Sequence, residues 1–188
     1  MGLALLTYFY FNFNDSKKQN VNGLLVSLIS QLTAKSNACY DILSALYDEY
    51  DAGLLLPDDD VLIDCLANML KTEGQPTIYI IMDAIDECPN SPSVVSPRKR
   101  VLQFVEKLVN LQLPNVRICA TSRPEADIRA SLETLASHKV SLHDEPGQNK
   151  DISHYVRSFV YSDLNMRRWR EEDKELVIDT LSQKADGM

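Results

Sequence analysis

Three carboxylates, Asp83, Asp86 and Glu87, lie within five residues of one another, directly after the apolar run 77–82. Carboxylate oxygens are ligands that Mg²⁺ accepts, and a positioned carboxylate can orient or deprotonate a water molecule. The run 77–82 is short, continuous and rich in β-branched residues, which indicates a strand buried on both faces, as in a parallel sheet. The carboxylates then stand at the carboxyl end of that strand, where ligands sit in open α/β sheets.

A second apolar run, residues 116–121, ends on Ser122 and Arg123. A connection of about 30 residues separates it from the first run, long enough for a helical crossover between parallel neighbours. The ends of neighbouring strands lie about 5 Å apart, so we expect Arg123 and the carboxylates at one edge of the sheet. Such a site can hold Mg²⁺ and clamp a phosphate oxygen. The alternative is a surface turn with a salt bridge that contributes little.

The elements that must position these residues follow from hydrophobic periodicity. Helical stripes are predicted over 21–32, 39–50, 58–70, 97–109 and 125–136, and further strands over 6–13 and 139–142. Buried strands that alternate with helices predict an α/β fold with a parallel sheet in three layers. The later part is helical only, over 151–161 and 171–185. We therefore expect an α/β core over 1–145 and a helical extension over 146–188.

Composition narrows the function classes. The chain has 188 residues, 45% hydrophobic residues and a net charge of −8, which is ordinary for a globular domain. The acidic balance disfavours nucleic acid, and the basic clusters 98–100 and 167–170 are interpreted as solvated helix surface. No apolar run is long enough to span a membrane. Four cysteines without CxxC spacing indicate reduced thiols and a cytoplasmic location.

Four apolar residues followed by Asp-Ala-Ile-Asp-Glu-Cys-Pro resemble the Walker B segment of NACHT-type P-loop NTPases, which belong to the STAND class of signalling ATPases. Residues 118–125 look like the sensor strand of that family, and residues 8–15 look like the strand after its first helix. Residues 151–156 and 184–188 are similar to its later helical segments. The likeness covers nearly the whole chain in the right order and is strongest for fungal proteins.

The resemblance implies roles for individual residues. Asp83 would reach Mg²⁺, and either Asp86 or Glu87 would orient or deprotonate the attacking water, with no ranking between the two. Arg123 would sense the γ-phosphate, with Ser122 beside it in the nucleotide site. The cofactors of the intact family are Mg²⁺ and ATP or GTP.

The sequence also departs from the family, because no G-x-x-x-x-G-K-[ST] segment occurs in it. That segment supplies the backbone cradle, the phosphate-binding lysine and the Mg²⁺ hydroxyl. In the family it lies just before the point where this chain begins. The resemblance therefore implies a P-loop NTPase-type core that is incomplete at its N-terminus, with weak or absent nucleotide binding.

Three functions compete at this point. The first is a partial NACHT signalling module with little hydrolysis, acting in regulated assembly or in an innate-immunity or incompatibility-like pathway. The second is a Mg²⁺-dependent ATP or GTP hydrolase completed by another chain. The third is a metal-dependent hydrolase that uses the carboxylates. The expected partners are further copies of the chain, or other NACHT or effector chains, rather than nucleic acid or a membrane.

In the family the P-loop strand lies centrally in the sheet, beside the sensor strand, and that strand is not present in this sequence. Strand 116–121 is left with an unpaired edge, which invites pairing with another chain. Three outcomes are open: residues 139–142 close against it, residues 3–6 fold into the gap, or another protomer pairs across it. We favour the third outcome, most simply as a twofold dimer.

Overall fold

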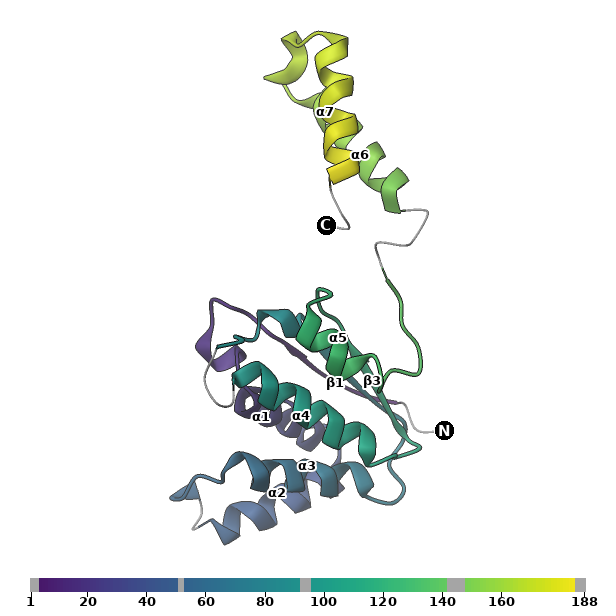
Figure 1. Cartoon of the computed structure of the whole chain (residues 1–188). Helices are drawn as coiled ribbons and strands as arrows, with labels where there is room; N and C mark the ends of the chain where they lie inside the picture. Colours follow the sequence, from purple (N-terminus) through teal and green to yellow (C-terminus); the bar gives the residue numbers. More distant parts are fainter. Residues whose placement is uncertain (1–3, 51–52, 92–95, 142–147, 185–188) are drawn as a thin grey trace. The chain divides into compact units, whose positions relative to one another are not determined.

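The computed structural model describes residues 4–50, 53–91, 96–141 and 148–184 (Figure 1). The chain divides into two compact units, Met1–Ala136 and Ser137–Met188. None of the helices in the described ranges is both long and apolar enough to cross a bilayer.

The first unit is built on a three-stranded parallel sheet. Its strands are β1 (Leu5–Tyr10), β2 (Ile78–Asp83) and β3 (Val116–Ala120), in the spatial order β1-β2-β3. Ile80 at the centre of β2 pairs with Thr7 on one side and with Ile118 on the other. The prediction of an α/β class with parallel strands is confirmed.

The strand expected over 139–142 does not form in the part of it that the structure describes. Residues 139–141 carry no strand assignment, and Val140 is 75% exposed. Residue 142 lies outside the described residues. Val140 lies between two polar residues, Lys139 and Ser141, which is the alternation typical of a strand. So short a segment is not stable as a strand unless it pairs with a neighbouring strand.

The described residues of the first unit also form five α-helices, and four of them begin at a side-chain cap. They are α1 (Val21–Thr33), α2 (Asn37–Glu49), α3 (Asp59–Lys71), α4 (Pro97–Asn110) and α5 (Ala126–Leu132). The side chain before each of the first four accepts a bond from a first-turn N–H, which explains where these helices start: Asn20, Ser36, Asp58 and Ser96. Helix α5 ends at Leu132, short of the expected residue 136.

The core lies against one face of the sheet only. Side chains that alternate along β1 and β2 are buried there, among them Phe9, Ile78 and Ile80. The opposite face carries Tyr8 and Tyr79, which are 41% and 47% exposed. The expectations that residues 77–82 are buried on both faces and that the sheet has helices on both sides are therefore wrong within the described residues.

Strand order explains the uncovered face. A parallel crossover is right-handed, so the side on which its helices lie depends on the direction in which the chain moves across the sheet. Both crossovers here step in the same direction, from β1 to β2 and from β2 to β3. Helices α1 and α4 accordingly lie on the same side of the sheet (Figure 1).

The second unit is a pair of antiparallel helices, α6 (Gln148–Ser162) and α7 (Glu171–Lys184), joined through the short 3₁₀ turn Met166–Arg168. Val160 and Ile178 are its buried apolar contacts. The guanidinium of Arg157 donates to both carboxylate oxygens of Glu175, at 2.7 and 2.6 Å. The helical character predicted for this part of the chain is confirmed.

Candidate functional site

A tight turn follows β2, and it is hydrogen-bonded to Thr121, the residue after β3. Ala84, which follows the last residue of β2, has the left-handed φ of 57°, an uncommon conformation for a residue with a Cβ. Its N–H donates to Thr121 Oγ1 at 3.1 Å, and the Thr121 hydroxyl donates to Asp83 Oδ1 at 2.5 Å. Thr121 therefore binds both the turn and the first carboxylate.

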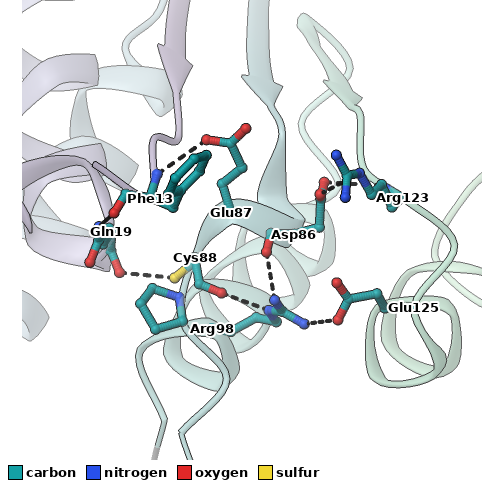
Figure 2. Close-up of a pocket in the computed structure, with 9 residues that line it drawn as sticks. Phe13, Gln19, Asp86, Glu87, Cys88, Arg98, Arg123 and Glu125 are labelled. Atoms are coloured by element: carbon teal, nitrogen blue, oxygen red, sulfur yellow. Dashed lines mark hydrogen bonds and ion pairs between the residues drawn. The ribbon is translucent and has the colours of Figure 1, made fainter. Parts of the chain in front are cut away.

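Asp86 and Arg123 meet at this edge. Asp86 Oδ1 accepts the backbone N–H of Arg123 at 3.0 Å, and Asp86 Oδ2 lies 3.5 Å from Arg123 Nε. The Asp86 side chain is 10% exposed, whereas that of Arg123 is 80% exposed. The structure thus brings together one of the three carboxylates and the arginine (Figure 2). The guanidinium itself lies largely in solvent.

The other site residues point to different partners. Glu87 Oε2 accepts the backbone N–H of Phe13 at 3.1 Å, which ties the turn after β2 to the loop after β1. The Ser122 hydroxyl donates to the carbonyl of its neighbour Arg123 at 2.9 Å. The three carboxylates therefore do not converge on one point. In the parts of the chain that are described, no three His, Cys, Asp or Glu side chains are grouped as metal ligands.

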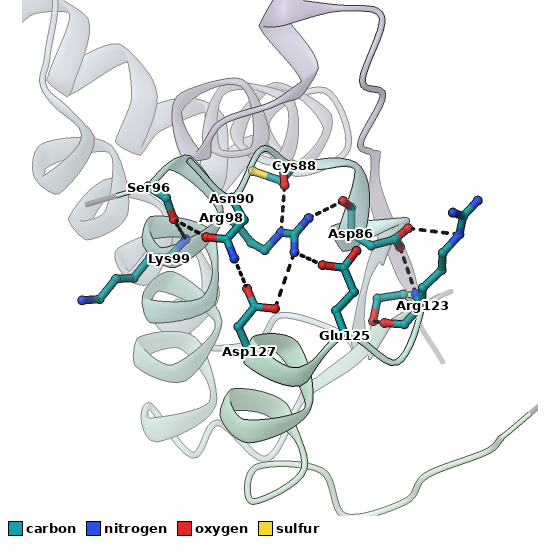
Figure 3. Close-up of polar contacts among 10 residues, drawn as sticks. Asp86, Cys88, Asn90, Ser96, Arg98, Lys99, Arg123, Glu125 and Asp127 are labelled. Carbon is teal, nitrogen blue, oxygen red and sulfur yellow. Dashed lines mark hydrogen bonds and ion pairs between the residues drawn. The ribbon is translucent and has the colours of Figure 1, made fainter. Parts of the chain in front are cut away.

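Arg98 is a site residue that the sequence reasoning missed. Its buried guanidinium donates from Nε to the Cys88 carbonyl at 2.8 Å and from Nη2 to the Asp86 carbonyl at 2.6 Å (Figure 3). Nη1 forms an ion pair with Glu125 and lies 3.5 Å from Asp127 Oδ1. One side chain thus joins the start of α4 to the turn after β2 and to the start of α5.

The assignment of residues 98–100 to solvated surface is wrong for Arg98 and holds for its two neighbours, which are exposed. The sequence feature that could have indicated its burial is its position, because Arg98 is the second helical residue after the cap Ser96. Composition cannot separate Arg98 from Lys99 and Arg100, because all three carry the same charge in one helical turn.

A cavity of about 410 Å³ opens between these groups. Figure 2 shows the side chains that line it, with the arginines facing the carboxylates. The charged lining consists of three carboxylates and two guanidiniums: Asp86, Glu87, Glu125, Arg98 and Arg123. Every guanidinium nitrogen of Arg98 is engaged within the protein, so of the two guanidiniums in the described lining only the exposed end of Arg123 is available to an anion.

These residues do not fit a magnesium–nucleotide complex. The cavity lining has an excess of negative charge, the carboxylates diverge, and the chain has no lysine-bearing phosphate cradle. A triphosphate needs several convergent N–H donors and cations at its oxygens. The described residues do not supply that set.

Cys88 also lines the cavity, and its thiol is held in the protonated form. Burial raises its pKa to about 11, although the charge of Arg98 acts in the opposite direction. The thiol donates to the carbonyl of Gln19 at 2.9 Å. A thiol with this pKa is a poor nucleophile at neutral pH, so Cys88 contributes packing here rather than covalent chemistry.

Comparison with known proteins gives two matches. A family model described as "Nephrocystin 3, N-terminal" matches residues 3–123, which span the sheet and the edge where Asp86 and Arg123 meet. The vegetative incompatibility protein HET-E-1 of Podospora anserina is 27% identical over 166 residues, covering 86% of this chain and 11% of that protein. No solved structure matches. The matches confirm the resemblance to fungal NACHT-type proteins, and the chain spans about a tenth of the length of the curated relative.

Proposed function

This chain belongs to the nephrocystin 3 N-terminal family, and from that premise we propose that it is a NACHT-like module of a cytoplasmic signalling protein that turns over little or no nucleotide. Its role is regulated assembly or signalling, of the incompatibility kind that the name of its fungal relative describes. The module acts through the arrangement of its strand ends rather than through hydrolysis.

The observation that supports this proposal is the closed Asp86–Arg123 pair. A general base must present a free oxygen to the water that it deprotonates. Asp86 uses one oxygen on a backbone N–H at 3.0 Å and holds the other 3.5 Å from a guanidinium nitrogen. The guanidinium that would neutralise a phosphate lies beside this carboxylate. The positive charge available to a phosphate and the basicity available to a water molecule are therefore both reduced.

Glu87 supports the same conclusion. Its carboxylate accepts the N–H of Phe13, a bond that joins two loops at the end of the sheet. Drawing Glu87 away to activate water breaks that bond, and because the bond is exposed the cost is below the ~1–3 kcal/mol of a buried group. The strand-end carboxylates thus connect loops in this chain, which is a structural role rather than a catalytic one.

Calorimetric titration of the purified chain with Mg²⁺ plus ATP, and separately with GTP, tests the proposal. The expected result is no binding tighter than about 1 mM, because several charge-assisted contacts of a nucleotide site are absent. A parallel assay of released phosphate is expected to show no rate above that of buffer.

Binding of ATP or GTP below about 10 μM would contradict this function. Hydrolysis that appears only when a second protein is added would instead support the hydrolase completed by another chain. An Asp83→Asn variant is the control in that case, since a genuine Mg²⁺-dependent rate must fall when this carboxylate is neutralised.

A further inference from the structure

The loop between α2 and α3 exposes a run of apolar side chains. Leu54, Leu55 and Leu56 are consecutive in the sequence, and they are 85%, 58% and 90% exposed. Single exposed leucines are ordinary on a protein surface. A run of three is an error of patterning unless it has a function, because it lowers solubility and adds nothing to the core. The loop therefore carries apolar surface that the fold of the described residues does not use.

This loop is held against the end of α2. The Tyr50 carbonyl accepts the N–H of Gly53 at 3.0 Å and the N–H of Leu55 at 3.3 Å. Gly53 has a φ of 84°, and a Cβ there would lie 2.7 Å from Cε2 of Tyr47, so the chain passes directly beside that ring. Tyr47 is itself 54% exposed. Tyr47 and the three leucines are thus held at one end of the helix pair, and we call these four residues the leucine surface.

The leucine surface is separate from the site at Asp86 and Arg123. Helices α2 and α3 lie beyond α1, on the side away from the sheet (Figure 1). None of the four residues lines the cavity at the strand ends. A partner bound to the leucine surface therefore does not compete with a ligand of that cavity.

The surroundings of the leucine surface are strongly acidic. Residues 36–70 contain eight Asp or Glu residues and no Lys or Arg. This stretch accounts for the whole net charge of −8, because the rest of the chain has 19 charges of each sign. Charge of one sign beside an apolar surface favours a partner of the opposite sign and disfavours the others.

Two of these carboxylates have an unfavourable position in the isolated chain. Asp48 and Glu49 are exposed in the last turn of α2, where the helix dipole already places partial negative charge. That turn contains no basic residue, and neither carboxylate has an ion-pair partner among the described residues. Cations bound beside them would relieve this repulsion.

The carboxylates at the start of α3 are compensated within the chain. Asp59 and Asp60 lie 3.3 Å from the side-chain nitrogens of Arg100 and Lys107, which belong to α4. The two carboxylates of α2 are therefore the ones that a cationic partner can use beside the leucine surface.

We propose that the leucine surface binds a basic amphipathic helix of a partner protein. Apolar side chains of that helix pack on Leu54 and Leu56, and its Lys or Arg side chains lie beside Asp48 and Glu49. An amphipathic helix presents both kinds of side chain within two turns, with its apolar anchors at i, i+3, i+4 and i+7. Its cations then stand at the C-terminus of α2, where the helix dipole favours positive charge.

A lipid bilayer is the other apolar phase that exposed leucines can enter, and the charge of this segment argues against it. Anionic lipids give the cytoplasmic leaflet a negative surface potential, which attracts basic segments. Residues 36–70 carry only negative charges. The same charges that attract a basic helix therefore repel that leaflet.

Fluorescence anisotropy with labelled peptides tests the proposal. The probe is a peptide of about 14 residues that contains only leucine and lysine, with the leucines at helical spacing. Its counterpart has glutamate in place of every lysine. The lysine peptide is expected to bind with a dissociation constant of about 10–100 μM, as befits a small interface, and more weakly as salt is added. No binding of the lysine peptide below about 1 mM, or equal binding of the glutamate peptide, overturns the proposal.

Leucine variants show whether the peptide binds at this place. The double variant Leu54→Ser, Leu56→Ser is expected to weaken binding by about tenfold or more, because two apolar contacts are lost. The matched control is Leu164→Ser, Leu176→Ser, since these leucines of the second unit are 79% and 66% exposed. The control is expected to change the dissociation constant by less than about twofold. Equal effects of the two double variants overturn the proposal.

Charge variants separate a local contact from a general attraction to an acidic chain. Asp48→Asn, Glu49→Gln is expected to weaken binding by about fivefold and to reduce its dependence on salt. Glu106→Gln, Glu172→Gln removes the same charge at two other exposed positions and is expected to have an effect of less than about twofold. Equal weakening by both double variants overturns the proposal.

Vesicles distinguish a protein partner from a membrane. The wild-type chain is expected to remain in the supernatant when vesicles of phosphatidylcholine and phosphatidylserine are sedimented. Sedimentation of the wild-type chain with the vesicles, lost in the Leu54→Ser, Leu56→Ser variant, would show that the leucines enter a bilayer and would overturn the proposal.

Discussion

Asp86 holds Arg123 by the main chain more closely than by the side chain, with the backbone N–H 3.0 Å from Oδ1 and the Nε atom 3.5 Å from Oδ2. The carboxylate is nearly buried and the guanidinium is mostly in solvent. The link between Asp86 and Arg123 is therefore a carboxylate-to-backbone bond, with a solvated ion pair beside it.

Substitution of the two partners is expected to show this difference. Arg123→Ala keeps the backbone bond and removes an exposed pair, so the free energy of unfolding is expected to fall by less than about 1 kcal/mol. Asp86→Ala removes the acceptor of the backbone N–H and is expected to cost about 1.5–3 kcal/mol. Urea unfolding followed by circular dichroism measures both, and equal losses would show that the side-chain pair is the main link.

Arg98→Met is expected to lower the free energy of unfolding, measured with urea, more than most substitutions in the first unit. It leaves the carbonyls of Asp86 and Cys88 without donors and Glu125 without its ion pair. Removing one member of a buried charged network costs about 3–5 kcal/mol, and the partial exposure of Glu125 lowers this to about 2–4 kcal/mol.

Arg100→Ala is the matched control for that measurement. Arg100 lies two residues further along α4, and its pair with Asp59 is 60% exposed on the arginine side. The expected loss in the free energy of unfolding is below about 1 kcal/mol. A similar loss for the two variants would contradict the buried role assigned to Arg98.

The cysteines are expected to differ in reactivity. Cys119 is exposed, whereas Cys88 is buried with its pKa raised to about 11. At pH 8 a thiol reagent is expected to modify Cys119 first and to leave Cys88 unmodified until the chain unfolds. Mass spectrometry of the labelled chain, with Cys119→Ser as the control, reads this directly.

The raised pKa of Cys88 also predicts a loss of stability in alkali. The folded state retains the thiol proton to a higher pH than the unfolded state, whose thiol titrates near 9.0. The stability contribution is therefore complete below about pH 9 and is lost as the pH rises through 11. Cys88→Ala is expected to flatten the slope of unfolding free energy against pH in that window, and an unchanged slope would count against the assignment.

In the second unit, Tyr161 is expected to ionise late. Its hydroxyl donates to Glu171 at 2.6 Å and to Glu175 at 3.0 Å, and these bonds to carboxylates raise its pKa to about 12. The bonds favour the folded state below about pH 10, the usual phenol value, and are lost as the pH rises through 12. A tyrosinate absorbance titration of wild type minus Tyr161→Phe is expected to show a step near pH 12. A difference step near pH 10 contradicts it.

Local sequence determined the helices and strands well. Helices α1, α3 and α4 follow from apolar stripes of helical period, and caps such as Asn20 and Ser96 mark where they begin. The meeting of Asp86 with Arg123 was predictable too, because residues that follow parallel neighbouring strands reach the same edge of a sheet. Both inferences depend on the hydrophobic period and on the number of residues between strands, and both can be read from a single sequence.

Tertiary structure alone decided the rest. Strand order is a relation between distant segments, and it is the order β1-β2-β3 that places the helices on one face and leaves Tyr8 and Tyr79 exposed. The burial of Arg98 depends on the carbonyls and carboxylates that α5 and the turn after β2 bring to it. The outer edge of β1 is likewise closed by Gln31, whose side-chain amide reaches the Tyr8 backbone only because α1 packs beside β1. Such contacts join residues far apart in sequence, so local patterns carry no record of them.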